Sequence, residues 1–140
     1  MPRPLYSVTI EGDTVIKKNS RVIFRKHDTG KPFIGKSERL RTAEHAAIWQ
    51  MRAARGSTIT QDVLAVFTFY TRTKRRVDLS NAYQLYEDAL EKAEVLVNDN
   101  QIRAHDGSRQ YYDKLNPRIE IKLFPFSDSI DNIVTSEAGL

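Results

Sequence analysis

The side chains best suited to chemistry gather in one segment, RRVDLSNAYQLYEDALEKAEVLVNDNQI, residues 75–102. Asp78 stands at the start of a predicted helix, and Asp99 follows that helix after a short apolar stretch. We expect a turn to bring Asp99 back beside Asp78, and two carboxylates that meet in this way form an oxygen-ligand site for a hard cation such as Mg²⁺. Helical spacing places three further polar residues on one narrow stripe: Asn81, Gln84 and Asp88.

Each of these acids also has an ordinary structural interpretation. Asp78 is a good amino-terminal cap, because its carboxylate accepts hydrogen bonds from the free N–H groups of the first helical turn. Asp88 faces Lys92 four residues further on, as an exposed helical ion pair. Asn98 and Asp99 together are typical of a turn. Spacing alone therefore leaves both a metal site and a set of structural roles open.

A strongly basic stretch comes directly before these acids. Its cations are Arg72, Lys74, Arg75 and Arg76, and Lys17 with Lys18 adds a basic pair upstream. The first 76 residues hold 16 Lys and Arg against 6 Asp and Glu, whereas the remaining 64 hold 6 against 12. Such an asymmetry can attract a polyanion to one surface while carboxylates lie nearby. Ordinary solvated charge is the alternative interpretation.

The composition excludes several other kinds of site. The chain has no Cys, which removes disulfides and thiolate zinc ligation and favours a reducing compartment. The three histidines have no metal-binding spacing, and phosphate-loop, dinucleotide-binding and serine-nucleophile motifs are missing. The longest apolar run, Val63 to Phe67, is too short to cross a membrane, and the amino end lacks the apolar core of a signal peptide. We therefore expect a cytoplasmic protein without a membrane partner.

The elements that must position these residues follow from periodicity. Strand patterns occupy residues 5–10, 21–25, 32–35, 63–70, 95–97 and 118–124, and helical patterns occupy residues 37–54 and 78–93. With 140 residues the chain is expected to form one domain. The order β-β-β-α-β-α-β-β predicts an α+β fold with a single mixed β-sheet and two main helices.

Two further expectations concern packing and the chain end. Residues 63–70, VLAVFTFY, are apolar on both faces, which predicts a central strand covered from both sides. The large aromatic side chains expected in the core are Trp49, Phe67, Phe69 and Phe124. Residues 127–140 have no clear period, so we expect a folded domain over residues 1–126 followed by a flexible tail.

The segment 75–102 resembles the signature of the RusA-type crossover junction endodeoxyribonucleases, the Holliday junction resolvases of phages and prophages. That signature is a basic pair, D-x-D-N, a lysine three residues after the Asn, an Asp before Ala-Leu, and, after a short strand, D-D-x-Q and an apolar residue. The matching residues are Arg75, Arg76, Asp78, Asn81, Asp88, Asp99, Gln101 and Ile102. The stretch KKNS at 17–20 and the pair Pro32-Phe33 are also similar to the family, so the likeness covers residues 5–124.

The resemblance implies a structure-selective endonuclease that resolves four-way DNA junctions by paired nicks in recombination and repair. It implies Mg²⁺, or Mn²⁺, held by Asp78 and Asp99 as metal ligands and catalytic carboxylates, in a homodimer acting on branched DNA in a bacterial or phage-infected cell. Supporting residues beside the site would be Asn81, Asp88 and Asn98. The DNA-binding residues would be Lys17, Lys18, Arg72, Lys74, Arg75 and Arg76.

Three positions depart from the signature. Ser80 stands in place of the second acid, Gln84 in place of the lysine, and Asn98 in place of the first acid of the D-D pair. Ser80 and Gln84 therefore occupy catalytic positions with weaker groups, and a branched-DNA-binding relative with a weakened site is an alternative. A third interpretation is an unrelated basic module for RNA, in which aromatic side chains stack on bases: Tyr70, Tyr111 and Tyr112.

Overall fold

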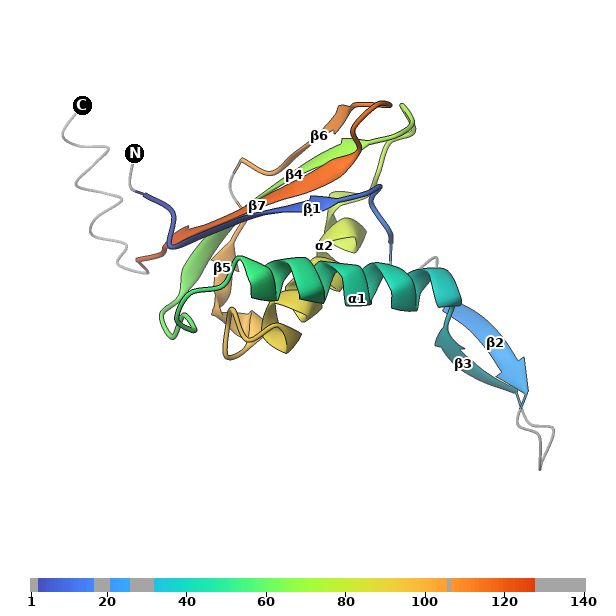
Figure 1. Ribbon diagram of the computed structural model, residues 1–140, viewed down its shortest axis with the longest axis horizontal. Helices are drawn as coiled ribbons and strands as arrows, with labels where there is room; N and C mark the ends of the chain where they lie inside the picture. Colours follow the sequence, from blue (N-terminus) through green and yellow to red (C-terminus); the bar gives the residue numbers. More distant parts are fainter. Residues whose placement is uncertain (1–2, 17–20, 26–31, 106, 128–140) are drawn as a thin grey trace.

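A computed structural model describes residues 3–16, 21–25, 32–105 and 107–127, and it describes only the backbone of residues 21–25 and 32–36 (Figure 1). Two of the predicted DNA-binding residues, Lys17 and Lys18, lie outside the described residues, as does the expected tail from residue 128 onward. No helix of the described part is long and apolar enough to cross a membrane.

The described chain alternates strands with two long helices. In order, the elements are β1 (Tyr6–Glu11), β2 (Arg21–Arg25), β3 (Pro32–Lys36), α1 (Glu38–Ala53), β4 (Val63–Thr71), α2 (Leu79–Lys92), the short 3-10 turn η2 (Asp99–Gln101), β5 (Ile102–Ala104), β6 (Arg109–Tyr112) and β7 (Arg118–Pro125). The predicted α+β fold with a mixed sheet and two main helices is confirmed.

The main sheet is mixed and has β4 in its interior. Its order is β1-β7-β4-β5, and β6 also pairs with β4. β7 runs antiparallel to β1 and β4, whereas β5 and β6 run parallel to β4. β5 pairs with the beginning of β4, where Val63 meets Ile102, and β6 pairs with its end, where Tyr70 meets Tyr111. The interior place of β4 is as predicted.

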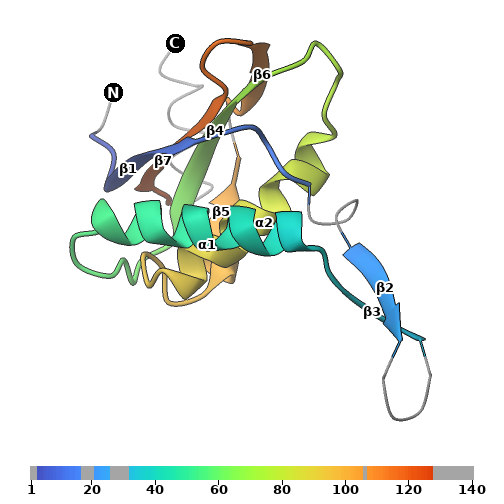
Figure 2. The same cartoon turned by 45° about the vertical axis from the view of Figure 1, so that its right-hand side comes forward.

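A separate hairpin projects from this body. β2 and β3 pair antiparallel with one another in a two-stranded sheet of their own. Figures 1 and 2 show this hairpin extending away from the main sheet beyond the amino end of α1. An isolated two-stranded hairpin is marginally stable in water, so the main body supplies most of the buried core.

Both helices cover the same face of the main sheet, and no helix of the described residues lies on the opposite face (Figure 2). Along β4 the side chains alternate between fully buried and half-buried. The expectation that β4 is covered from both sides is therefore wrong. Its outward residues Leu64 and Val66 are apolar and half-buried, because β4 lies between neighbouring strands.

The core lies between the helices and the covered face. α1 contributes Leu40, Ala47 and Met51, and α2 contributes a longer apolar stripe: Ala82, Leu85, Tyr86, Ala89 and Leu90. Phe67 and Phe69 of β4 are fully buried, as predicted, and Phe67 packs against the ring of Tyr83 with centroids 5.2 Å apart. Aromatic contacts of this kind add to the stabilisation that burial gives.

Trp49 does not belong to this core, although the sequence analysis placed it there. Its side chain is 74% exposed. The buried positions of α1 recur from Leu40 through Ala47 to Met51, and Trp49 follows Ala47 by two residues, which turns its side chain about 200° around the helix. Phe124 is only half-buried, because it points to the face without helices.

The chain after α2 also differs from the prediction. The expected strand at 95–97 is reduced to a single bridge between Ile59 and Leu96. The helix ends at Lys92 with Ala93 as its cap, and Glu94 adopts a left-handed conformation with φ 61°. That residue redirects the chain into η2, and the short strands β5 and β6 follow in sequence too polar to show a strand pattern.

Candidate functional site

A pocket of about 410 Å³ opens at the amino end of α2. Its walls come from the segment after β1, the start of α1, the loop after β4 and the first turn of α2. The charged and amide side chains that line it are Asp13, Arg39, Arg75, Arg76, Asp78 and Asn81. Three guanidinium groups from two distant segments thus surround a site that contains the predicted catalytic Asp78. Such a pocket suits a phosphate group.

Asp78 caps α2 as its structural interpretation requires. Its Oδ1 accepts a hydrogen bond from the backbone N of Ser80 at 3.0 Å, and its Oδ2 accepts one from Nδ2 of Asn81 at 3.3 Å. The residue is exposed, and a carboxylate offers about four lone-pair directions. Capping therefore leaves acceptor capacity for a cation, and the bond from Asn81 restrains the orientation of the carboxylate.

Two of the three departures from the family signature lie on α2, which Asp78 caps. Ser80 and Gln84 are both exposed. A serine hydroxyl at the first position is a weaker cation ligand than a carboxylate. At the second position, the amide of Gln84 cannot supply the positive charge that a lysine would give to a phosphate.

The basic loop, residues 72–76, has a fixed backbone. Gln110 of β6 donates from Nε2 to the backbone O of Arg75 at 2.9 Å and accepts at Oε1 from the backbone N of Val77 at 2.8 Å. Oδ1 of Asp13 accepts from the backbone N of Arg72 at 3.1 Å. These bonds hold the peptide chain while the four cationic side chains of the loop stay exposed, so the charges are presented to solvent from a preorganised loop.

The segment 13–16 is held next to the same pocket. Oδ1 of Asp13 also accepts from the backbone N of Thr14 at 3.0 Å, and the hydroxyl of Tyr86 accepts from the backbone N of Val15 at 3.1 Å. Burial raises the pKa of Tyr86 to about 12, so this hydroxyl stays protonated at neutral pH. The segment therefore has defined contacts at the pocket wall.

Arg39 is the member of this pocket that the sequence analysis missed as a site residue. It is one of four arginines between residues 39 and 55, the others being Arg41, Arg52 and Arg55. Ser37 caps α1 by accepting from the backbone N of Leu40 at 3.1 Å, which places Arg39 in the first turn beside the pocket. The spacing of these arginines does not single out Arg39. Only its place in the fold, beside the pocket, distinguishes it.

Asp99 lies in a different setting, at the carboxyl end of α2. The turn η2 begins with Asn98, whose side chain accepts from the backbone N of Asn100 at 2.8 Å. Gln101 is 7% exposed and donates from Nε2 to the backbone O of Ile59 and of Gln61, each at 2.9 Å. Its Oε1 accepts from the backbone N of Val97 and Asn98 at 2.8 and 2.9 Å. The signature glutamine thus holds the backbone on both sides of Asp99.

The surroundings of Asp99 are acidic. Burial raises the pKa of Glu87, the hydrogen bond and charge of His105 lower it, and the negative charges of Asp99 and Asp88 raise it further. Nε2 of His105 contacts Oε1 of Glu87, and the ring of His105 stacks on Tyr83 with centroids 4.2 Å apart. Asp88 therefore lies on the Asp99 side of α2 and does not support Asp78.

Within one chain, Asp78 and Asp99 are not neighbours, and the expectation of a turn that joins them is wrong. Asp78 caps the first turn of α2, whereas η2 follows its last turn. The 14 residues of α2 span roughly 21 Å, far more than the ~4 Å that separates two ligands of one Mg²⁺ ion with bonds of about 2 Å. In the part of the chain that the structure describes, no three His, Asp or Glu side chains are grouped to hold a metal.

The sequence matches the model of a known protein family. The family model described as Endodeoxyribonuclease RusA matches residues 14–124. The protein belongs to the RusA endodeoxyribonuclease family. The family consists of divalent-metal-dependent Holliday junction resolvases that act on branched DNA. No curated protein matches the sequence.

Proposed function

We propose that this protein is a Mg²⁺-dependent endonuclease that resolves four-way DNA junctions by paired nicks, acting as a homodimer in recombination and repair. The observation that carries the proposal is the pocket at the amino end of α2, where Asp78 lies among Arg39, Arg75 and Arg76. A carboxylate beside several guanidinium groups suits a metal-assisted attack on a phosphodiester. We place the catalytic domain in residues 1–126, with residues 127–140 as an appended tail.

The metal ligands in this proposal are Asp78 and Asp99, with Mn²⁺ as an alternative to Mg²⁺. The donor set fits a hard cation, because both groups are carboxylates on preorganised turns. When bound, the ion polarises the phosphoryl oxygen and lowers the pKa of the attacking water. Asn81 orients Asp78, and Gln101 orients the backbone that carries Asp99. Ser80 and Gln84 flank the reacting phosphate with neutral polar groups.

The separation of the two carboxylates leads to a composite site. Since one chain holds Asp78 and Asp99 at opposite ends of α2, a single metal can bind both only if they come from different chains. A two-fold dimer supplies two such pairs, each with Asp78 of one protomer and the partner's Asp99. This geometry agrees with the near two-fold symmetry of a four-way junction and with one nick in each of two opposed strands.

DNA binding in this proposal rests on phosphate contacts. The exposed side chains of Arg72, Lys74, Arg75 and Arg76 would neutralise backbone phosphates, with Lys17 and Lys18 expected to contribute. Arg39 would hold a phosphate inside the pocket. Such contacts release counterions, so the affinity should fall steeply with salt and depend little on sequence.

The first test is incubation of the purified protein with a labelled four-way junction, with and without Mg²⁺ or Mn²⁺, beside a linear duplex of the same sequence. Paired, metal-dependent nicks on the junction alone are expected. Binding without nicking under every metal condition would contradict the enzymatic proposal and favour a junction-binding relative with a weakened site. In that case, the double change Ser80→Asp with Gln84→Lys should restore nicking.

The composite site has its own test, which uses two inactive variants together. Asp78→Asn and Asp99→Asn are each expected to lower the nicking rate by more than the roughly 10- to 100-fold that loss of a mere supporting residue causes. A co-expressed mixture should recover nicking of single strands, because each heterodimer keeps one intact pair. If both carboxylates served the same chain's site, every site in the heterodimer would be damaged, and the mixture would stay inactive.

A further inference from the structure

The helix-free face of the main sheet carries an aromatic row at the end nearest the basic loop. The register places Arg118 of β7, Tyr70 of β4 and Tyr111 of β6 side by side across three strands. The guanidinium of Arg118 lies 3.7 Å from the centroid of the Tyr70 ring, and the Tyr70 and Tyr111 rings are stacked with centroids 5.6 Å apart. Tyr70 is half-buried, whereas Tyr111, on the outermost strand of the row, is 44% exposed.

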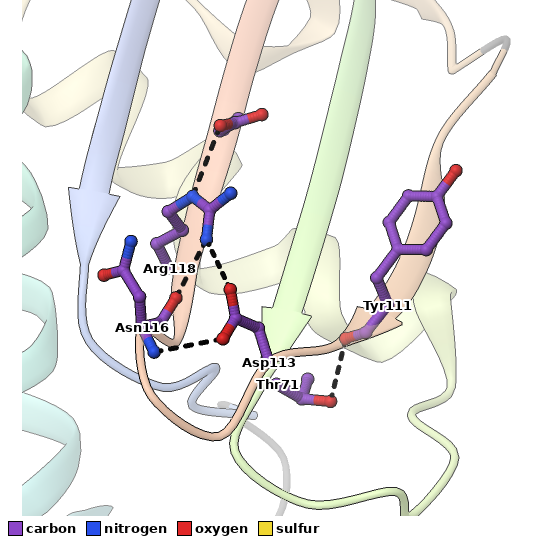
Figure 3. A network of polar contacts seen from close by, with 6 residues as sticks. Thr71, Tyr111, Asp113, Asn116 and Arg118 are labelled. Atoms are coloured by element: carbon purple, nitrogen blue, oxygen red, sulfur yellow. Dashed lines mark hydrogen bonds and ion pairs between the residues drawn. The ribbon is translucent and has the colours of Figure 1, made fainter.

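A network of hydrogen bonds at the end of β4 holds the aromatic row in place. Arg118 donates from Nη1 to Oδ2 of Asp113 and to the backbone O of Asn116, each at 3.0 Å. The backbone N of Asp113 donates to the O of Thr71 at 2.8 Å, and the Thr71 hydroxyl donates to the O of Tyr111 at 3.3 Å. Figure 3 shows these residues at the end of β4, with the Tyr111 ring standing clear of the network. The ring is therefore held on a rigid base and is free to contact a ligand.

The charges around Tyr111 favour an anionic partner. Nη1 of Arg109 donates to the Tyr111 hydroxyl at 3.3 Å, and Nε donates to the O of Gly107 at 3.1 Å. Among the described residues, Arg109 has no carboxylate partner, in contrast to Arg118, which is neutralised by Asp113 and Glu120. An exposed aromatic ring next to a guanidinium that no acid neutralises is the pairing that binds a base and its phosphate together.

This aromatic row is continuous with the proposed DNA-binding loop. Gln110, between Arg109 and Tyr111 on β6, makes the two bonds that fix the backbone of the basic loop. On the other side of β6, the ammonium of Lys74 lies 5.4 Å from the centroid of the Tyr112 ring. The cations of the loop and the exposed Tyr111 ring therefore lie on the two sides of one edge strand, and a DNA strand that follows the loop reaches Tyr111 by passing around β6.

We propose that Tyr111, supported by Tyr70 and flanked by Arg109, is a stacking platform for an unstacked DNA base near the crossover of the junction. The inference rests on the proposed function and adds to it a contact that recognises an unstacked base rather than the charge of the phosphates. Base pairs beside a crossover lose a stacking neighbour when the arms are separated, so a base there is the least costly to expose. A stacked base would explain selectivity for junctions over duplex without any contact to a base edge.

The test measures binding, not nicking. Wild-type protein and variants are titrated in EDTA against a four-way junction carrying 2-aminopurine at the crossover, a linear duplex, and a single-stranded oligo-dT. Tyr111→Ala should weaken binding to the junction and to oligo-dT on the order of tenfold and leave duplex binding nearly unchanged, since stacking contributes about that much per base. Tyr111→Phe should keep the affinity. Tyr111→Leu, which preserves apolar bulk, should lose it.

Two matched controls locate the effect. Tyr112→Ala removes a tyrosine of similar exposure from the opposite side of β6, and Leu115→Ala removes a side chain that is 94% exposed on the following loop. Neither should change the 2-aminopurine signal. Circular dichroism and light scattering are recorded for every variant, so that loss of fold or of the dimer is detected.

The outcomes separate this inference from the proposed function. If wild-type protein nicks the junction and Tyr111→Ala binds it as tightly, the platform is overturned and the enzyme stands. If binding depends on Tyr111 but no metal supports nicking, the enzymatic proposal fails and the platform stands. A loss of affinity that follows a loss of dimer, equal affinity for Tyr111→Leu, or stronger competition by single-stranded RNA than by the junction would each overturn the platform.

Discussion

The two ends of α2 carry the same chemical group in opposite electrostatic settings. At the amino end, Asp78 faces a pocket with three arginines and a basic loop. At the carboxyl end, the charges of Asp99 and Asp88 both act on Glu87, which His105 contacts. The first setting attracts a phosphate, whereas the second repels one and gathers negative charge that a metal ion can neutralise.

The comparison shows that each end supplies what the other lacks. The amino end offers phosphate-binding cations and one oriented carboxylate. The carboxyl end offers several carboxylates, one of them on a turn that Gln101 holds in place. Neither end holds enough ligands for a tightly bound cation within the described chain. The rigid helix between Asp78 and Asp99 keeps the two carboxylates apart in one protomer, so in the proposed dimer completion of the site and assembly of the protein would be the same event.

The largest expected effect tests the rigidity of the acidic end. Gln101→Ala removes the four hydrogen bonds that this buried side chain makes to the backbone of Ile59, Gln61, Val97 and Asn98. The free energy of unfolding should fall by about 3 kcal/mol, since each net hydrogen bond contributes roughly 0.5–1.5 kcal/mol. Urea titration measures the loss. Asn100→Ala, an exposed change in the same turn, is the control, and equal stability of both variants would contradict the role given to Gln101.

The next effect tests the basic end. Arg39→Ala should weaken junction binding roughly fivefold to tenfold and reduce the slope of log affinity against log salt by about 1, as expected for loss of one phosphate contact. Arg41→Ala removes the same charge from an exposed position of α1 outside the pocket. Equal salt slopes for the two variants, measured by fluorescence anisotropy, would show that Arg39 acts only through net charge.

A smaller effect concerns the pH dependence of the acidic end. Because burial raises the pKa of Glu87 above its ordinary value of 4.5, the folded state binds this proton more tightly than the unfolded state. The contribution of Glu87 to stability is therefore greatest below pH 4.5 and decreases as the pH rises through the raised pKa. Glu87→Gln should remove this decrease. Melting temperatures of both proteins between pH 4 and pH 7 provide the measurement, and parallel curves would count against it.

The smallest effect tests how α2 is ended. Glu94 has φ 61°, a conformation that is unfavourable for residues other than Gly. Glu94→Gly should raise the free energy of unfolding by up to about 1 kcal/mol, because relief of this strain exceeds the loss of an exposed ion pair with Arg55. Glu91→Gly, inside the helix, should lower it by about 1 kcal/mol. Thermal unfolding of the two variants should shift in opposite directions.

The sequence was sufficient for the helices and insufficient for their surroundings. The predicted helix at 78–93 coincides with α2 and its two caps. Apolar residues that recur with a period of 3.6 indicate both that a segment is helical and which of its faces is buried. The exposure of Trp49 was missed because the size and hydrophobicity of its ring were given more weight than its spacing from Ala47, which already puts it on the exposed side of α1. β6 was missed as well, since an edge strand of polar and aromatic residues shows no alternation.

The same distinction applies to the candidate site. Asp78 and the basic loop could be found locally, because a cap and the residues just before it are neighbours in the chain. The pocket around Asp78 could not, since Arg39 and Asp13 reach it only through the packing of α1 and β1. The expected meeting of Asp78 with Asp99 failed because the length of a rigid helix was not weighed against the length of a metal–ligand bond.

The exposed indole of Trp49 has a practical consequence for experiments on this protein. It is the only tryptophan in the sequence and lies on α1 beside His45 and Arg52. Its fluorescence is therefore an intrinsic probe of one surface, and a soluble quencher such as acrylamide should reach it readily. Unfolding should change that emission little, because the indole is already in water, whereas a partner that covers α1 should shield it and shift its emission to the blue.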